Sequence, residues 1–146
     1  MKEIARSAIV EHTPEQMYAL VDDIASYPRF LPWCQEARLE EIDGRRRATL
    51  TAGMAAVRQV FTTENENQPG RAIDMRLIEG PFRHFSASWR FAPLGSHGCQ
   101  VDFELRYEFA SRALGRVLEP LFDRIADTMV DAFTRRADEL YGPHPG

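Results

Sequence analysis

The chain has 146 residues, of which 44% are hydrophobic and 27% are charged. These proportions are those of a globular domain, and they exclude a disordered or fibrous chain. Eighteen basic against 22 acidic residues give a formal net charge of −4, which argues against partners held by overall charge, such as nonspecifically bound duplex DNA. We expect one domain over residues 1–146, with a disordered tail at 143–146.

Nothing in the chain predicts export or a membrane span. The start, MKEIARSAIVEHTPEQ, lacks an apolar stretch of signal-peptide length, and no later segment approaches the ~20 apolar residues that cross a bilayer. Cys34 and Cys99 lie far apart in a chain that is large enough to fold without a disulfide, so we expect two reduced thiols. We expect a cytoplasmic protein that meets the inner membrane only peripherally.

A strand and two short helices are predicted near the N-terminus. Residues 3–11 form the expected first strand. Thr13 and Gln16 then supply the two members of a capping box at the start of a helix. Ser26 is the expected cap of a second, very short helix, which Pro32 ends.

From residue 34 to residue 109 the hydrophobic period becomes two, which predicts strands. The clearest strand covers residues 100–109, where polar and apolar residues alternate without exception. Glycine, proline and asparagine divide the rest into strand-length runs. The predicted breaks fall at 43–44, near 53, at 65–70, at 80–81 and at 93–98. With the first strand, this makes an antiparallel sheet of about seven strands.

A single long helix is predicted over residues 112–141. Ser111 caps it, Gly142 ends it, and its apolar stripe begins at Leu114 and Val117. Seven strands make a sheet roughly 30 Å wide, whereas one helix is about 10 to 12 Å across. The sheet must therefore curl around the helix, which predicts an α+β fold with a hydrophobic tunnel between the two layers. The alternative is that bulky side chains fill this space as an ordinary core.

Several blocks of the sequence resemble one family. They are YPRFLPWC at 27–34, FTTEN at 61–65, LIEGPF at 77–82, VDFELRYEF at 101–109 and MVDAFTRRADELYG at 129–142. With them the chain resembles the coenzyme-Q-binding, polyketide-cyclase-like branch of the START superfamily, whose bacterial members include the ribosome association toxins. The resemblance implies a helix-grip (START/Bet v1-like) fold with two short helices after the first strand. It also implies a tunnel for a hydrophobic small molecule, ubiquinone in the respiratory members.

The candidate ligand-binding residues are the inward positions of the strands and the long helix, together with the FLPW segment at 30–33. Four of them carry a hydrogen-bond donor for a quinone headgroup: Tyr27, Trp33, Gln59 and Tyr107. The others would form apolar walls: Phe30, Leu31, Phe61, Met75, Leu77, Phe82, Phe85, Trp89, Phe91, Phe103, Phe122, Ile125 and Met129. Phe85 is bulkier than the aliphatic residue that the resemblance implies there, which would shorten the tunnel.

The FLPW segment has two interpretations. It either gates the tunnel and touches a membrane surface, where aromatic side chains settle at headgroup depth, or it forms a hydrophobic plug on the first helix. The sequence leaves both open.

No motif for catalysis is present. The chain lacks a nucleophile elbow, a phosphate-binding glycine loop and an H-E-x-x-H motif. Its histidines are scattered and it has no C-x-x-C pair, so we expect neither a metal site nor a required cofactor. The sequence favours a non-enzymatic carrier of ubiquinone that supports respiration. A cyclase- or aromatase-like enzyme is the least favoured alternative.

Seventeen of the 18 basic residues are arginine, a side chain that binds phosphate with a bidentate fork. Arg45, Arg46 and Arg47 form the one continuous run and are candidate RNA contacts. A second candidate surface is the helix face with Arg112, Arg116 and Arg124. Since the resembled toxins act on ribosomes, the alternative function is a ribosome-binding toxin that blocks association of the ribosomal subunits.

Overall fold

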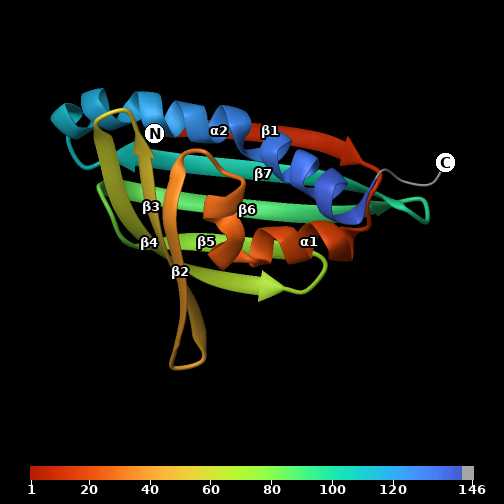
Figure 1. The fold of residues 1–146 in the computed structure, drawn as a ribbon. Helices are drawn as coiled ribbons and strands as arrows, with labels where there is room; N and C mark the ends of the chain where they lie inside the picture. The colour runs from red at the N-terminus through yellow and green to blue at the C-terminus, as the bar shows by residue number, and fades with distance from the viewer. Residues whose placement is uncertain (143–146) are drawn as a thin grey trace.

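Within residues 1–142, which the computed structural model describes, seven strands form one antiparallel sheet (Figure 1). They are β1 (Lys2–Val10), β2 (Cys34–Ile42), β3 (Arg45–Met54), β4 (Val57–Gln68), β5 (Ala72–Glu79), β6 (Phe82–Leu94) and β7 (Gly98–Phe109). The spatial order is β1-β7-β6-β5-β4-β3-β2. The predicted α+β class and the seven-stranded sheet are therefore confirmed. The tail expected at 143–146 lies outside the described residues.

Two of the predicted breaks are shorter in the structure. β4 continues through Asn65 and Asn67 to Gln68, because their polar side chains find partners beside the sheet. The Thr63 hydroxyl donates to the Asn65 side-chain oxygen at 2.8 Å, and the Asn67 amide donates to Asp22 at 2.7 Å. β6 likewise runs past Pro93, so the turn before β7 is only three residues long.

Two short helices follow β1: α1 (Pro14–Asp22) and the 3₁₀ helix η1 (Ile24–Arg29). The capping box of α1 is confirmed, since the Thr13 hydroxyl accepts from the Gln16 backbone N–H at 3.1 Å and the Gln16 side chain accepts from the Thr13 N–H at 2.9 Å. The predicted cap of the second helix is wrong. Ser26 lies inside η1, because that helix starts directly after α1.

The last element is α2 (Arg112–Tyr141), with Ser111 as its N-cap and Gly142 as its C-cap, as predicted. The predicted start of its apolar stripe is wrong: Leu114 is 38% exposed and Val117 is 55% exposed. The buried stripe instead passes through Gly115, where an added Cβ would lie 3.3 Å from the Phe109 ring. Leu114 and Val117 consequently face solvent.

All the helices cover one face of the curved sheet (Figure 1). α2 lies along β1 and β7, and ion pairs join its acidic side chains to edge strand β1, including one from Arg6 to Asp127 at 2.9 Å. α1 and η1 cover the neighbouring part, and α1 contacts both β6 and β7. The β2–β3 hairpin projects beyond the body of the molecule. None of the helices in residues 1–142 is long and apolar enough to cross a membrane.

Candidate functional site

A gap between the sheet and α2 is present, as the width argument predicts, but it is small. Its volume is about 50 Å³, which holds a few water molecules. Ligand pockets for drug-sized molecules are usually about 300 to 1,000 Å³. The predicted tunnel is therefore present only as a small cavity. The reason is that α1, η1 and the following segment also cover the concave face and place Ile24, Tyr27 and Trp33 in the gap.

The structure brings ten of the predicted ligand-binding residues together around this cavity: Tyr27, Trp33, Phe61, Met75, Phe85, Trp89, Phe103, Phe122, Ile125 and Met129. Seven do not line it. Phe82 and Tyr107 pack in an aromatic cluster with Phe109, and Phe91 lies against Trp89. The others are Phe30, Leu31, Gln59 and Leu77.

The four predicted hydrogen-bond donors differ in whether they are already used. The Tyr27 hydroxyl donates to the Val21 carbonyl, and burial raises its pKa. The Gln59 amide donates to the Val60 carbonyl at 2.9 Å. The Trp33 indole N–H and the Tyr107 hydroxyl are buried without a hydrogen-bond partner among the described residues. Trp33 is thus a cavity-lining donor with no acceptor.

The FLPW segment is packed as a plug. Leu31 is 1% exposed and Trp33 is 4% exposed, while the half-buried Phe30 ring packs edge-on against Tyr27 and Phe133. The Gly53 backbone N–H donates to the Trp33 carbonyl at 2.8 Å, which fixes the segment to β3. The segment is therefore a buried plug, with its contacts to η1, α2 and β3 rather than to the first helix as predicted.

Several cavity residues are missing from the sequence prediction: Ile24, Ala48, Leu50, Thr63, Asn65, Ala87 and Leu105. Their positions carry a signal, because Thr63 and Asn65 continue the alternation that starts at Phe61. Thr63 and Asn65 are polar, however, and alternation marks the inward face most clearly when the inward residues are large and apolar. The polar ends of Thr63 and Asn65 pair with each other inside the wall.

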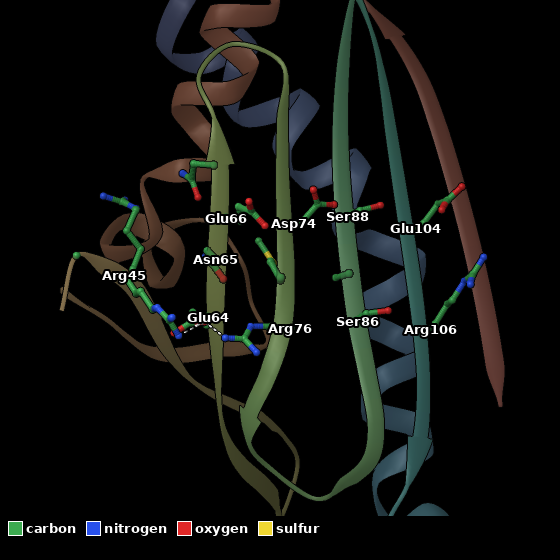
Figure 2. A pocket seen from close by; sticks show the side chains of 15 residues that line it. Arg45, Glu64, Asn65, Glu66, Asp74, Arg76, Ser86, Ser88, Glu104 and Arg106 are labelled. Atoms are coloured by element: carbon green, nitrogen blue, oxygen red, sulfur yellow. Dashed lines mark hydrogen bonds and ion pairs between the residues drawn. The ribbon is translucent and has the colours of Figure 1, made fainter. Parts of the chain in front are cut away.

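The side chains of the arginine run form ion pairs with nearby carboxylates. Glu64, whose side chain is 9% exposed, receives a hydrogen bond from Arg76 (Figure 2). Arg45 and Arg47 lie 3.7 and 3.8 Å from its carboxylate. Arg46 points elsewhere and pairs with Asp22 at 2.9 Å. Arg45, Arg46 and Arg47 are therefore ion-paired side chains rather than a free basic run.

Figure 2 shows the outer-face depression around Glu64, which has a volume of about 950 Å³. Rows of side chains from β4 to β7 cross it, with Ser86 and Ser88 between the charged residues. Four arginines in its lining are matched by four carboxylates: Arg45, Arg46, Arg76 and Arg106 against Glu64, Glu66, Asp74 and Glu104. This balance gives the depression no preference for an anion.

A different groove lies between η1, the β3–β4 turn and α2, with a volume of about 730 Å³. Its apolar floor contains Phe30, Trp33 and Met54. Its walls carry four arginines and one carboxylate: Arg29, Arg124, Arg135, Arg136 and Glu139. We call this feature the α2 groove. Trp33 borders both the α2 groove and the interior cavity.

Both cysteine thiols lie in buried surroundings. Burial raises the pKa of the Cys34 and Cys99 thiols to about 11 each, so both are protonated at neutral pH. Within residues 1–142, no group of three or more His, Cys, Asp or Glu side chains is placed to hold a metal ion.

The family model for polyketide cyclase, dehydrase and lipid transport proteins matches residues 10–134. The chain belongs to this family. The ribosome association toxin RatA of Vibrio cholerae is 39% identical over 97% of this chain and 99% of the relative. The mitochondrial coenzyme Q-binding protein COQ10 homolog B of Xenopus laevis is 31% identical over 96% of this chain and 59% of the relative.

A comparison with solved structures confirms the expected helix-grip fold. The Zhui aromatase/cyclase from a Streptomyces species superposes with a TM-score of 0.82, covering 97% of this chain and 98% of the other. The two sequences are only 18% identical. The likeness therefore concerns the fold and not the reaction.

Proposed function

We propose that this protein binds ribosomes and blocks the association of the ribosomal subunits. The observation that carries the proposal is the 39% identity with the RatA toxin along nearly the whole of both chains. The function that the sequence favours, ubiquinone transport, has the more distant relative, at 31% identity. The ribosomal alternative therefore becomes the main proposal.

The interior supports a function exerted through the surface. The cavity of about 50 Å³ has no room for a quinone with an isoprenoid tail, whereas the α2 groove offers about 730 Å³. We also propose that the protein acts by binding and not by catalysis, with no required cofactor. The protonated thiols and the absence of a nucleophile motif support this part of the proposal.

The direct test is sedimentation of the purified protein with isolated small and large ribosomal subunits on sucrose gradients. We expect the protein to migrate with one of the subunits and to leave the top of the gradient. Recovery of all the protein at the top, with either subunit in excess, would contradict the proposal.

A second candidate function is the binding of a quinone or another apolar ligand that carries a carbonyl acceptor. The observation that favours it is the Trp33 indole N–H, which is buried without an acceptor at the wall of an apolar cavity. A ligand carbonyl would satisfy this donor, but the cavity must first widen by movement of α2 or of the FLPW plug. Such a carrier would visit the inner membrane peripherally.

Titration with a short-chain ubiquinone, followed by tryptophan fluorescence, tests this second function. Wild-type protein should bind the quinone and Trp33→Phe, which keeps an aromatic ring but removes the donor, should bind it more weakly. Trp89 remains as the reporter in the variant. The absence of saturable binding to the wild type, together with no quinone in organic extracts of the purified protein, would remove it.

A further inference from the structure

We infer that the α2 groove is the surface that holds the phosphodiester backbone of ribosomal RNA. The inference rests on the proposed ribosomal function and assigns it to one face of the molecule. It also moves the expected contact away from the run at Arg45, Arg46 and Arg47, each of which lies in an ion pair with Glu64 or Asp22.

Arginines of the α2 groove carry unpaired positive charge. Arg29, Arg124 and Arg135 are exposed and form no ion pair with any residue of 1–142. Arg136 lies 3.4 Å from Glu139 and over the Phe30 ring at 5.3 Å, so its charge is partly used. The groove therefore keeps a local positive charge on a protein whose formal net charge is −4. Such local charge attracts phosphate even when the whole molecule repels it.

The unpaired arginines are spaced along the groove as a nucleic-acid strand requires. Arg124 and Arg135 belong to one face of α2 with Thr128 between them, since their spacings of four and seven residues match the helical period. At ~1.5 Å per residue they are about 16 Å apart along the axis. That length corresponds to about five stacked nucleotides of one strand, at ~3.4 Å each. Arg29 comes from η1 on the opposite side.

The shape of the α2 groove and its apolar floor also fit a nucleic-acid strand. The groove is recessed between η1, the β3–β4 turn and α2, which suits a narrow polyanion better than the flat surface of a bilayer. Phe30 and Met54 are half-buried in its lining and give apolar contact area for ribose and base edges. The floor is fixed, because Trp33 is buried and the Gly53 N–H holds its carbonyl.

The experiment compares two charge-reversed proteins. The groove variant is Arg124→Glu/Arg135→Glu, and the matched control is Arg38→Glu/Arg45→Glu on the projecting β2–β3 hairpin. Each pair changes the net charge by the same amount and alters exposed side chains only. Circular dichroism and thermal melting establish that both variants are folded. Affinity is measured for isolated ribosomal subunits, for protein-free ribosomal RNA and for phosphatidylglycerol vesicles over a range of salt concentrations.

We expect the groove variant to bind subunits and free RNA at least tenfold more weakly than wild type. For this variant, the slope of log affinity against log salt concentration should be shallower by about two, one for each lost phosphate contact. The control should stay within about twofold of wild type. Equal loss in the hairpin control, or no loss in the groove variant, overturns the inference while the ribosomal function stands.

Two further outcomes concern the wild-type protein and decide whether the proposed function falls together with the inference. Wild-type protein that binds neither subunits nor free RNA overturns both. Wild-type protein that binds the vesicles but not RNA overturns the inference in favour of a membrane surface.

Discussion

The burial of Trp33 predicts how much stability the loss of its side chain will cost. Its side chain is 4% exposed and borders both the cavity and the α2 groove. Truncating a buried aromatic side chain to alanine costs about 3 to 5 kcal/mol. We predict a loss in this range for Trp33→Ala in urea unfolding, and a clearly smaller loss for Trp33→Phe. A loss below about 1 kcal/mol for Trp33→Ala would mean that the segment is a loose gate.

Glu64 is the residue through which stability should depend on acid. The hydrogen bond from Arg76 and the charges of Arg45 and Arg47 hold the pKa of Glu64 below its ordinary value of 4.5. A carboxylate with a lowered folded-state pKa stabilises the fold above its unfolded pKa, and this contribution is lost as the pH falls through the folded-state value. Glu64→Gln should therefore be less stable than wild type at neutral pH and should lose less stability below pH 4.5.

The control for this prediction is Glu66→Gln, two residues further along β4, where the carboxylate is exposed. Urea unfolding from pH 7 to pH 3 compares the three proteins. If the free energy of unfolding of wild type and of Glu64→Gln changes with pH in parallel, the arginines around Glu64 contribute nothing to the loss of stability in acid.

We predict that Phe85 limits the size of the cavity. It lines the cavity and its ring centroid lies 5.9 Å from Phe61 and 5.0 Å from Phe82. Because Phe85 is only half-buried, Phe85→Ala should cost about 2 to 3 kcal/mol, somewhat less than a fully buried ring. It should also increase the affinity for a short-chain ubiquinone, measured by fluorescence titration. Unchanged or weaker quinone binding by a folded variant would show that Phe85 does not limit the cavity.

At the scale of elements, α1 completes the cover of the concave face, and its capping box sets where it starts. Thr13→Ala removes the side-chain acceptor for the Gln16 N–H and should destabilise the protein by about 1 kcal/mol. Thr13→Ser keeps the hydroxyl and should stay within about 0.5 kcal/mol of wild type. Thermal unfolding measures both. Equal losses in the two variants would show that packing of the methyl group, and not the cap, holds α1.

Elements with a strong local signal could be predicted from the sequence. Thr13 with Gln16, Ser111, and the strict alternation of β7 are each determined by neighbours within a few residues. Features that depend on tertiary contacts could not. The helical period predicts that α2 has an apolar face, but only the contact of Gly115 with Phe109 decides that Leu114 lies outside it.

The cavity residues could also be predicted from local signals, whereas the α2 groove could not. The alternation of the strands places Phe61, Trp89 and Phe103 on the inner face, and they do line the cavity. The α2 groove joins Arg29 to Arg124 and Arg135 across about a hundred residues of sequence, and no spacing rule connects them. The ion pairs of the arginine run likewise depend on Glu64 from the next strand and Asp22 from α1.

The sheet is wider than one helix, and it curls around α2 as this difference in width predicts. The width comparison does not predict how the space between the sheet and α2 is filled. It leaves out α1, η1 and the FLPW plug, which occupy the space beside α2 (Figure 1). The result is a nearly solid interior and an external groove that carries unpaired positive charge. This distribution favours a macromolecular partner over an enclosed small molecule.

Inhibition of subunit association can be measured by light scattering of isolated small and large ribosomal subunits during their reassociation at raised magnesium. Wild-type protein should lower the rate and the final amplitude of reassociation in proportion to its concentration, and Arg124→Glu/Arg135→Glu should have much less effect. Reassociation with the same rate and amplitude in the presence of excess wild-type protein would contradict the account.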